Sequence, residues 1–276
     1  MAEKKGLIIT VNFNSHEETI NYLLSLSQID QFNCLDVIIA DNSSSMDHFN
    51  VITRFIDEND WENISIIKME KNLGYFGAVR FILDNNNQNK SLYEFIIVSN
   101  NDIIIKDKNI IDNILFHIDK AEVFAPKIIN IKNQRNQNPF QISKHNIKNE
   151  IFHIFYYSSF FMAKAILGIR NILIRRKLND NSSEKEMPIY AGHGSFLIFS
   201  NSFFKKGGYI DNNFFLYAEE NTLAEIVLKI NGIILYVPDI VIFHESRGTV
   251  ARRLTKEKYL IQKDAYEYFN NNYGES

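Results

Sequence analysis

The chain has 276 residues, 45% of them hydrophobic, so it is long enough to bury a sizeable core within one α/β domain. Thirty basic and 33 acidic residues leave a net charge of −3, which argues against a nucleic-acid-binding protein. Cys34 is the only cysteine, which excludes an intrachain disulfide framework and a cysteine-based zinc site and fits a reducing cytoplasm. The polar start and the lack of a long uncharged run predict neither a signal peptide nor a membrane span.

Short apolar, β-branched runs alternate with helical patterns along the first half of the chain. Four runs predict buried parallel strands: Gly6–Asn12, Leu35–Ala40, Ile64–Ile67 and Glu94–Ser99. A helix capped by Asn14 or Ser15 follows the first run, and another is expected from about Phe76 to Asn85. This alternation predicts a doubly wound, mostly parallel α/β sheet with helices on both faces.

The middle of the chain departs from this alternation between about residues 130 and 186. Asn130–Asn149 is polar and predicts a loop, whereas Ile151–Asn179 carries five basic and no acidic residues among many aromatic and aliphatic ones. After this insertion, three more strands are expected at Ser195–Phe199, Ile233–Val237 and Ile240–Phe243. A helix is expected from Glu219, with Gly232 at its C-cap.

Polar residues follow two of the predicted strands, at the carboxyl ends where ligands bind in sheets of this kind. Asp41-Asn42-Ser43-Ser44 offers a carboxylate that can accept the imide N–H of a pyrimidine, although an ordinary Asx turn is the alternative. Asn100-Asn101-Asp102 offers oxygen ligands of the kind that Mg²⁺ or Mn²⁺ takes, and a plain strand-end turn is the alternative there.

Two glycines lie at the predicted loop-to-helix junction in Asn72–Arg80. Backbone N–H groups of Gly74 and Gly77 can bind an anion at this helix start, and Arg80 can add a phosphate contact. The spacing matches neither the dinucleotide fingerprint nor a Walker motif, and a simple glycine turn is the alternative.

Three features of the last third can also carry chemistry. Glu219–Glu220 begins the late helix, a position that acidic residues favour for the helix dipole alone. Gly192–Ser195, which contains His193, precedes a strand. His244 follows the last strand, where it can meet a diphosphate or simply be a polar surface residue.

In this order, the features resemble the family-2 glycosyltransferases of the GT-A fold, particularly bacterial rhamnosyltransferase-like and other surface-polysaccharide enzymes. The resemblance covers nearly the whole chain from Leu7 to about Arg253 and implies a single catalytic domain. The matching stretches are Val11–Asn14, Asp41–Ser44, Asn72–Arg80, Ser99–Ile103, Gly192–Ser200, Gly207–Glu220 and Phe243–Glu245.

The resemblance also implies roles for individual residues. It places the nucleotide sugar against Asn14, Asp41, Asn72, Gly74, Gly77, Arg80, Asn101 and His193. Asp102 would hold Mg²⁺ or Mn²⁺ on the diphosphate with help from His244, while Asn100 stands where the family has the first acid of its metal motif. Glu220 would be the general base, with Glu219 as its substitute, at a place where the family has an aspartate. Ile226 stands where many relatives have arginine.

The implied reaction is inverting transfer of a sugar from a UDP- or dTDP-sugar to a hydroxyl of a glycan or a polyprenyl-diphosphate-linked acceptor in surface-polysaccharide synthesis. The nucleotide half would span about residues 1–125 and the acceptor and catalytic half about 186–255. Two other functions are considered. A nucleotidyltransferase would need a basic, glycine-rich loop after the first strand, which is acidic here (VNFNSHEE), and the second is a non-catalytic sugar-nucleotide-binding protein.

The basic and apolar segment 151–179 predicts peripheral contact with the inner face of the plasma membrane. A core helix or a subunit interface in a homo-oligomer is the alternative for this segment.

Overall fold

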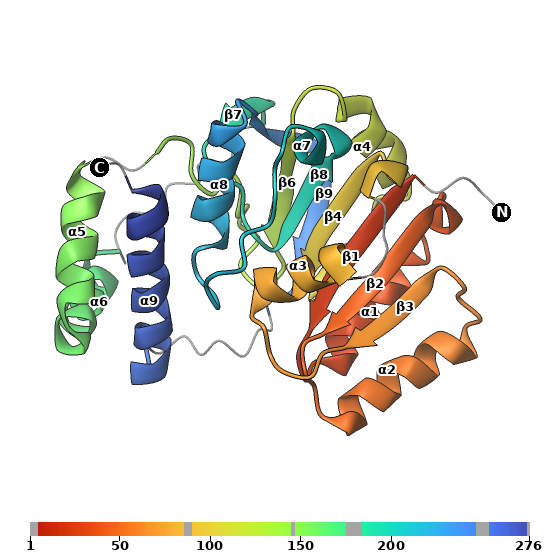
Figure 1. Cartoon of the computed structure of the whole chain (residues 1–276), viewed down its shortest axis with the longest axis horizontal. Helices are drawn as coiled ribbons and strands as arrows, with labels where there is room; N and C mark the ends of the chain where they lie inside the picture. Colours follow the sequence, from red (N-terminus) through yellow and green to blue (C-terminus); the bar gives the residue numbers. More distant parts are fainter. Residues whose placement is uncertain (1–4, 86–89, 145–146, 175–183, 247–253, 275–276) are drawn as a thin grey trace.

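A single sheet forms the centre of the molecule (Figure 1). The computed structural model describes residues 5–85, 90–144, 147–174, 184–246 and 254–274. Within them, nine strands have the order β3-β2-β1-β4-β8-β6-β9-β5, and β7 pairs with β9. The strands are β1 (Gly6–Asn12), β2 (Leu35–Asp41), β3 (Ile64–Lys68), β4 (Phe95–Asn100), β5 (Ile103–Ile105), β6 (Val123–Asn130), β7 (Met187–Ile189), β8 (Phe196–Ser200) and β9 (Ile234–His244).

Six of these strands run in one direction. β1 pairs in parallel with β2 and β4, and β2 pairs in parallel with β3. β8 lies antiparallel between β4 and β6, so β6 and its parallel neighbour β9 run the same way as β1. β5 and β7 are antiparallel to β9. The predicted mostly parallel α/β sheet is confirmed.

Helices cover both faces of the sheet because successive strand residues point to opposite sides. Leu7 and Ile9 of β1 pack in one cluster with α3, α8 and α9, whereas Ile8 packs in the other with α1, α2 and α4. The helices are α1 (His16–Leu26), α2 (Met46–Glu58), α3 (Tyr75–Asn85), α4 (Ile110–His117), α5 (Ile147–Ser158), α6 (Phe160–Ile174), α7 (Asn201–Lys205), α8 (Glu219–Lys229) and α9 (Lys256–Tyr273).

Helices α5 and α6 lie beside α9, away from the sheet (Figure 1). Both belong to the insertion between β6 and β7, and they share a small cluster of buried side chains, Tyr156, Ala163 and Tyr259, with α9. The loop predicted over Asn130–Asn149 ends slightly earlier than expected, because α5 begins at Ile147. Among the described residues, no helix is both long and apolar enough to span a membrane.

The prediction of two separate final strands was wrong, because Ile234–His244 is one strand. Its pairing with β6 shifts between Pro126, which lies opposite Val237, and Lys127, which lies opposite Val241. Pro238 has no N–H to donate to a ladder, so the strand bulges there instead of ending.

Candidate active site

The carboxyl ends of the strands bring the predicted polar residues to one edge of the sheet. Asn12 ends β1 and lies in register with Asp41, the last residue of β2. Asn100 ends the neighbouring strand β4, and His244 ends β9. Because β5 starts directly after Asp102 and pairs with the end of β9, Asp102 and His244 meet at the same edge.

Asp41 is fully buried beneath its own loop. Its Oδ2 accepts a hydrogen bond from Asn12 Nδ2 at 2.7 Å, and its Oδ1 accepts one from the Ser44 N–H at 2.9 Å. The Lys68 ammonium lies 3.5 Å from Oδ1 and donates to the Ser44 carbonyl. The carboxylate therefore fixes the loop in this conformation, and its contact with a pyrimidine stays a prediction.

The Asn42 side chain joins this loop to the glycine turn. Its Nδ2 donates to Asn72 Oδ1 and to the Gly74 carbonyl, both at 2.9 Å, and its Oδ1 accepts the Leu73 N–H at 2.7 Å. Gly74 has a φ of +77°, and a Cβ there would lie 2.0 Å from the Phe215 carbonyl oxygen. Only glycine fits at this position, because the turn packs directly against the segment that leads into α8.

Asn14 and Asn101 connect the loops that follow β1, β2 and β4. Asn14 Oδ1 accepts the Ser45 N–H, and the Asn14 N–H donates to Ser44 Oγ, both at 2.9 Å. Asn101 Nδ2 donates to Ser15 Oγ at 2.6 Å. Both amides thus hold loops in place, and their predicted contacts with a nucleotide sugar stay predictions.

Gly77 and Arg80 lie on α3. A Cβ on Gly77 would approach Leu73 Cβ to 3.0 Å, so this glycine lets the helix start close to the turn. The Arg80 guanidinium pairs with Asp84 and lies 3.4 Å from the Ile210 carbonyl oxygen. Arg80 therefore has two protein partners here, and its phosphate contact stays a prediction.

Asp102 and His244 form a buried acid–imidazole pair. His244 Nε2 lies 3.1 Å from Asp102 Oδ1, and His244 Nδ1 lies 2.7 Å from Gln137 Oε1. Burial alone would raise the pKa of Asp102, but the nearby His244, through its polar contact and its charge, and then Asn100 lower it. If His244 Nδ1–H donates to Gln137, the other ring nitrogen, Nε2, faces the Asp102 carboxylate. Two acceptors cannot bond directly to each other, so a proton or a cation must lie between them.

This pair fits a divalent cation that shares its coordination with a substrate. The donor set is one carboxylate, a ligand that Mg²⁺ and Mn²⁺ both take, and one imidazole, a common ligand of transition metals. Asp102 Oδ1 is buried and makes no well-aligned hydrogen bond with the described residues, although His244 is at ion-pair distance. Those residues contain no cluster of three His, Cys, Asp or Glu ligands, so phosphate oxygens would have to complete the shell. Asn100 donates to Asp102, which leaves its role as a ligand a prediction.

His193 lies beside this pair. Its ring centroid is 6.0 Å from that of His244, and its Nε2 lies 3.3 Å from Gln137 Nε2. Burial, followed by the charge of His244, lowers the pKa of His193 to about 4. The ring is therefore neutral near pH 7, and Gln137 orients both imidazoles by donating to one and accepting from the other.

Glu219 and Glu220 open α8, next to the Gly192–Ser195 segment. Glu220 Oε1 accepts the Gly194 N–H at 3.1 Å, and a Cβ on residue 194 would lie 3.0 Å from the same oxygen. Burial raises the pKa of both carboxyls, and the charge of Glu220 further raises the pKa of Glu219, to about 8. Burial therefore favours a proton on the pair near neutral pH, and Glu220, whose Oε1 is fixed by the Gly194 N–H, is the better placed of the two to act as a base.

The sequence analysis assigned no role to three residues of this edge. Gln137 lies in a polar stretch without any pattern, and only the fold brings it to the histidines. The Tyr75 hydroxyl donates to the Gly194 carbonyl at 2.9 Å and so joins α3 to the carboxylate pair. Phe13 follows β1 with 50% of its surface exposed. In the sequence, an aromatic residue directly after a predicted buried strand was the one feature that could have indicated a ring able to stack on a nucleotide base.

Solved structures with the same fold are glycosyltransferases at low sequence identity. The structure of GalNAc-T7 with UDP, GalNAc and Mn²⁺ matches with a TM-score of 0.65 and 12% identity, over 97% of this chain and 48% of that one. TarS from S. aureus (residues 1–349) with UDP-GlcNAc matches with a TM-score of 0.57 and 14% identity, over 97% of this chain and 67% of that one. The mannosyltransferase PcManGT from Pyrobaculum calidifontis with GDP-Man and Mn²⁺ matches with a TM-score of 0.55 and 12% identity, over 97% of this chain and 65% of that one. This chain thus spans about half of the first of these proteins and about two thirds of the other two.

No curated protein matches the sequence. The family model described as glycosyl transferase family 2 matches residues 7–201, which contain all the strand ends described above except that of β9. Glu219, Glu220 and His244 lie beyond the matched range, so the match does not bear on the roles predicted for them. A model that covers well over half of the sequence, on a fold shared with solved glycosyltransferases, shows that the chain belongs to glycosyl transferase family 2.

Proposed function

We propose that the protein transfers a sugar from a UDP- or dTDP-sugar to a hydroxyl group of a glycan acceptor, with inversion at the anomeric carbon. The observation that carries this proposal is the carboxylate pair at the start of α8. Glu220 is held against Gly194 at the edge where Asp102 and His244 also lie. The UDP, UDP-GlcNAc and GDP-Man in the similar structures support a nucleoside-diphosphate sugar as the donor.

Glu220 acts as the general base in this proposal. It takes the proton of the acceptor hydroxyl while that oxygen bonds to the anomeric carbon, and the bond to the nucleoside diphosphate breaks on the opposite face. Glu219 stays protonated, because burial and the charge of Glu220 raise its pKa to about 8. Asp102 and His244 would hold a Mg²⁺ or Mn²⁺ ion, which neutralises negative charge on the departing diphosphate when it is bound.

The donor is expected to stabilise the folded protein against heat. UDP- or dTDP-sugars with Mn²⁺ at about 100 times their dissociation constant should raise Tm by roughly 5 °C, because binding to the native state adds about 2.7 kcal/mol. The matched controls are the free sugar with Mn²⁺ and the nucleotide sugar with EDTA. A panel of UDP-, dTDP- and GDP-sugars that leaves Tm unchanged would contradict the proposal. Slow hydrolysis of the stabilising donor then distinguishes an enzyme from a non-catalytic binding protein.

We also propose that the acceptor is carried on a lipid at the inner face of the plasma membrane and that segment 151–179 contacts this surface. Apolar side chains of α5 and α6 face solvent, with Phe155 57% and Phe161 82% exposed, and Lys164 lies over the Phe160 ring. Three of the basic residues on which the prediction rests, at positions 175–177, lie outside the described residues.

Vesicle flotation measures this contact. The wild-type protein should float with phosphatidylglycerol vesicles at low salt, and Phe161→Ser should lower the partition coefficient about tenfold, the value of one buried aromatic side chain. Phe116→Ser, at a phenylalanine of α4 that is 75% exposed, is the matched control and should float like the wild type. Equal flotation of both variants would exclude α6 from the contact.

A further inference from the structure

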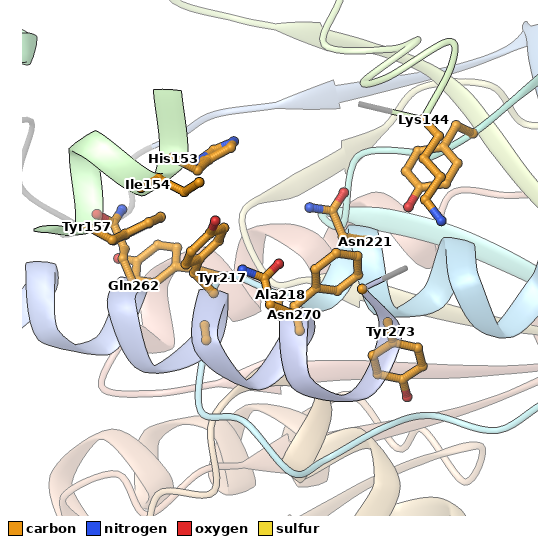
Figure 2. Close-up of a pocket in the computed structure, with 15 residues that line it drawn as sticks. Lys144, His153, Ile154, Tyr157, Tyr217, Ala218, Asn221, Gln262, Asn270 and Tyr273 are labelled. Carbon is orange, nitrogen blue, oxygen red and sulfur yellow. The ribbon is translucent and has the colours of Figure 1, made fainter. Parts of the chain in front are cut away.

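A pocket of about 630 Å³ lies between α5, α9 and the start of α8 (Figure 2). This volume falls within the range of about 300–1,000 Å³ that is typical of small-molecule sites. His153, Ile154 and Tyr157 of α5 lie across the pocket from Gln262 and Asn270 of α9 (Figure 2). None of the residues assigned above to the donor or the metal lines it.

The chemistry of the lining is aromatic and uncharged. Six aromatic rings besides His153 face the pocket: Tyr157, Tyr190, Tyr217, Tyr266, Phe269 and Tyr273. Lys144 is the only charged side chain among the described lining residues, and its ammonium lies 3.0 Å from Glu225 Oε1. A phosphate or diphosphate group would therefore find no unpaired cation among these described lining residues. Rings beside neutral amides instead suit a ligand with apolar faces and many hydroxyl groups, which is a saccharide.

The walls of the pocket are already fixed by hydrogen bonds. The Tyr190 hydroxyl donates to Glu225 Oε1 at 2.6 Å, and the Tyr273 hydroxyl donates to Asp211 Oδ2, also at 2.6 Å. The side-chain oxygen of Asn221, in contrast, is buried without a hydrogen-bond partner among the described residues. A buried amide oxygen without a partner is costly unless a ligand or water supplies a donor. A sugar hydroxyl is such a donor.

The pocket adjoins the carboxylate pair along the chain. Tyr217 and Ala218, which directly precede Glu219, line it, and Asn221, which directly follows Glu220, lines it as well. Tyr217 has a φ of +78°, a conformation that a bulky side chain rarely adopts. Backbone strain of this kind is concentrated at functional sites, where the surrounding structure holds it.

We propose that this pocket binds a neutral saccharide unit of the acceptor and thereby presents its hydroxyl group to the catalytic edge. The catalytic part of this statement rests on the proposed function, whereas saccharide binding does not. The insertion that contains α5 and α6 would then contribute to acceptor recognition through the α5 wall of the pocket.

Saccharide binding is measured directly on the full chain by saturation-transfer difference NMR. The probes are methyl glycosides of glucose, galactose, mannose, rhamnose and N-acetylglucosamine, together with octyl glucoside below its micelle concentration. At least one glycoside should give ring-proton signals with the wild-type protein. Asn270→Trp, which fills the pocket from α9, should abolish them. Asn271→Trp, the same change at an exposed asparagine one residue further along α9 that does not line the pocket, should leave them intact.

A second variant tests the amide without filling the space. Asn221→Ala should weaken saccharide binding about tenfold or more, the effect of losing one well-made hydrogen bond in a buried site. It should not lower Tm, because the amide oxygen has no hydrogen-bond partner to lose in the described part of the chain. A lower Tm with unchanged saccharide binding would assign Asn221 a structural role and overturn its part in the proposal.

The outcomes separate this proposal from the proposed function. No signal from any glycoside, equal signals from both tryptophan variants, or octyl glucoside signals confined to the alkyl chain would each overturn the saccharide pocket. Donor-induced stabilisation should be the same in the wild type and in both tryptophan variants. The two proposals can also fail separately. If Asn270→Trp blocks saccharide binding but no nucleotide sugar stabilises the wild-type protein, the proposed function is wrong and the saccharide pocket is supported.

Discussion

Replacing Glu220 with glutamine is expected to lower the turnover number by about 10²-fold or more, the usual contribution of a general base. The amide oxygen can still accept the Gly194 N–H that Glu220 Oε1 accepts at 3.1 Å, so the fold and donor binding should be retained. The loss should appear in kcat, with little change in the KM for the donor. Steady-state kinetics with a saturating nucleotide sugar measure both constants.

Glu219→Gln is the matched control for this change. A glutamine closely resembles the protonated acid that the raised pKa of Glu219, about 8, maintains near pH 7, so this variant should keep most of its activity. An active Glu220→Gln protein together with an inactive Glu219→Gln protein would reverse the assignment of the base.

The pH profile of kcat/KM gives an independent measure of the same assignment. Burial raises the pKa of Glu220, and a base must be ionised to act, so activity should fall with decreasing pH through a pKa above that of an ordinary glutamate. This acidic limb should disappear from the residual activity of Glu220→Gln.

Replacing Asp102 with asparagine should have the second largest effect, a loss of turnover of about 10²-fold or more, because a divalent cation contributes several kcal/mol of charge stabilisation. The substitution removes the carboxylate that lies 3.1 Å from His244 Nε2. Donor affinity of the wild type should depend on Mn²⁺ and fall with EDTA, whereas the affinity of the variant should be low with or without the metal. Calorimetric titration of the donor under both conditions measures this dependence.

Asp119→Asn is the control for the loss of one negative charge, since Asp119 is exposed in the turn that follows α4, and it should behave like the wild type. A wild-type enzyme whose donor affinity and turnover are unchanged by EDTA would show that no metal acts at Asp102.

The positions of the strand ends were predictable because period and composition identify buried parallel strands. Once Gly6–Asn12, Leu35–Ala40 and Glu94–Ser99 are recognised as parallel strands, the residues after them must share an edge. The sequence analysis therefore grouped Asp41 with Asp102, and it added His244 because this residue follows the last strand. The structure brings His244 to Asp102 through β5, a three-residue strand too short to produce a pattern.

The orientation of the side chains could not be predicted from the sequence. A strand-end carboxylate can face a ligand or fix its own loop, and the burial of Asp41 under Ser44 depends on the packing of Lys68 and Asn12. Gln137 illustrates a second limit, because it reaches His193 and His244 from a segment with no periodicity. Hydrophobic patterns describe the core, whereas such contacts depend on tertiary placement.

The position of α5 and α6 between β6 and β7 affects how readily this protein can change during evolution. The entropy of closing a loop grows only with the logarithm of its length, so doubling a connection costs about 0.6 kcal/mol. The insertion can therefore lengthen, shorten or be exchanged at little cost to the sheet, and the α5 side of the pocket would change with it. A one-residue shift in β1 or β4, in contrast, would turn every side chain of that strand to the opposite face. The α5 wall of the pocket can therefore change in length and sequence, whereas the register of the strands that end at the catalytic edge cannot shift without disrupting the core.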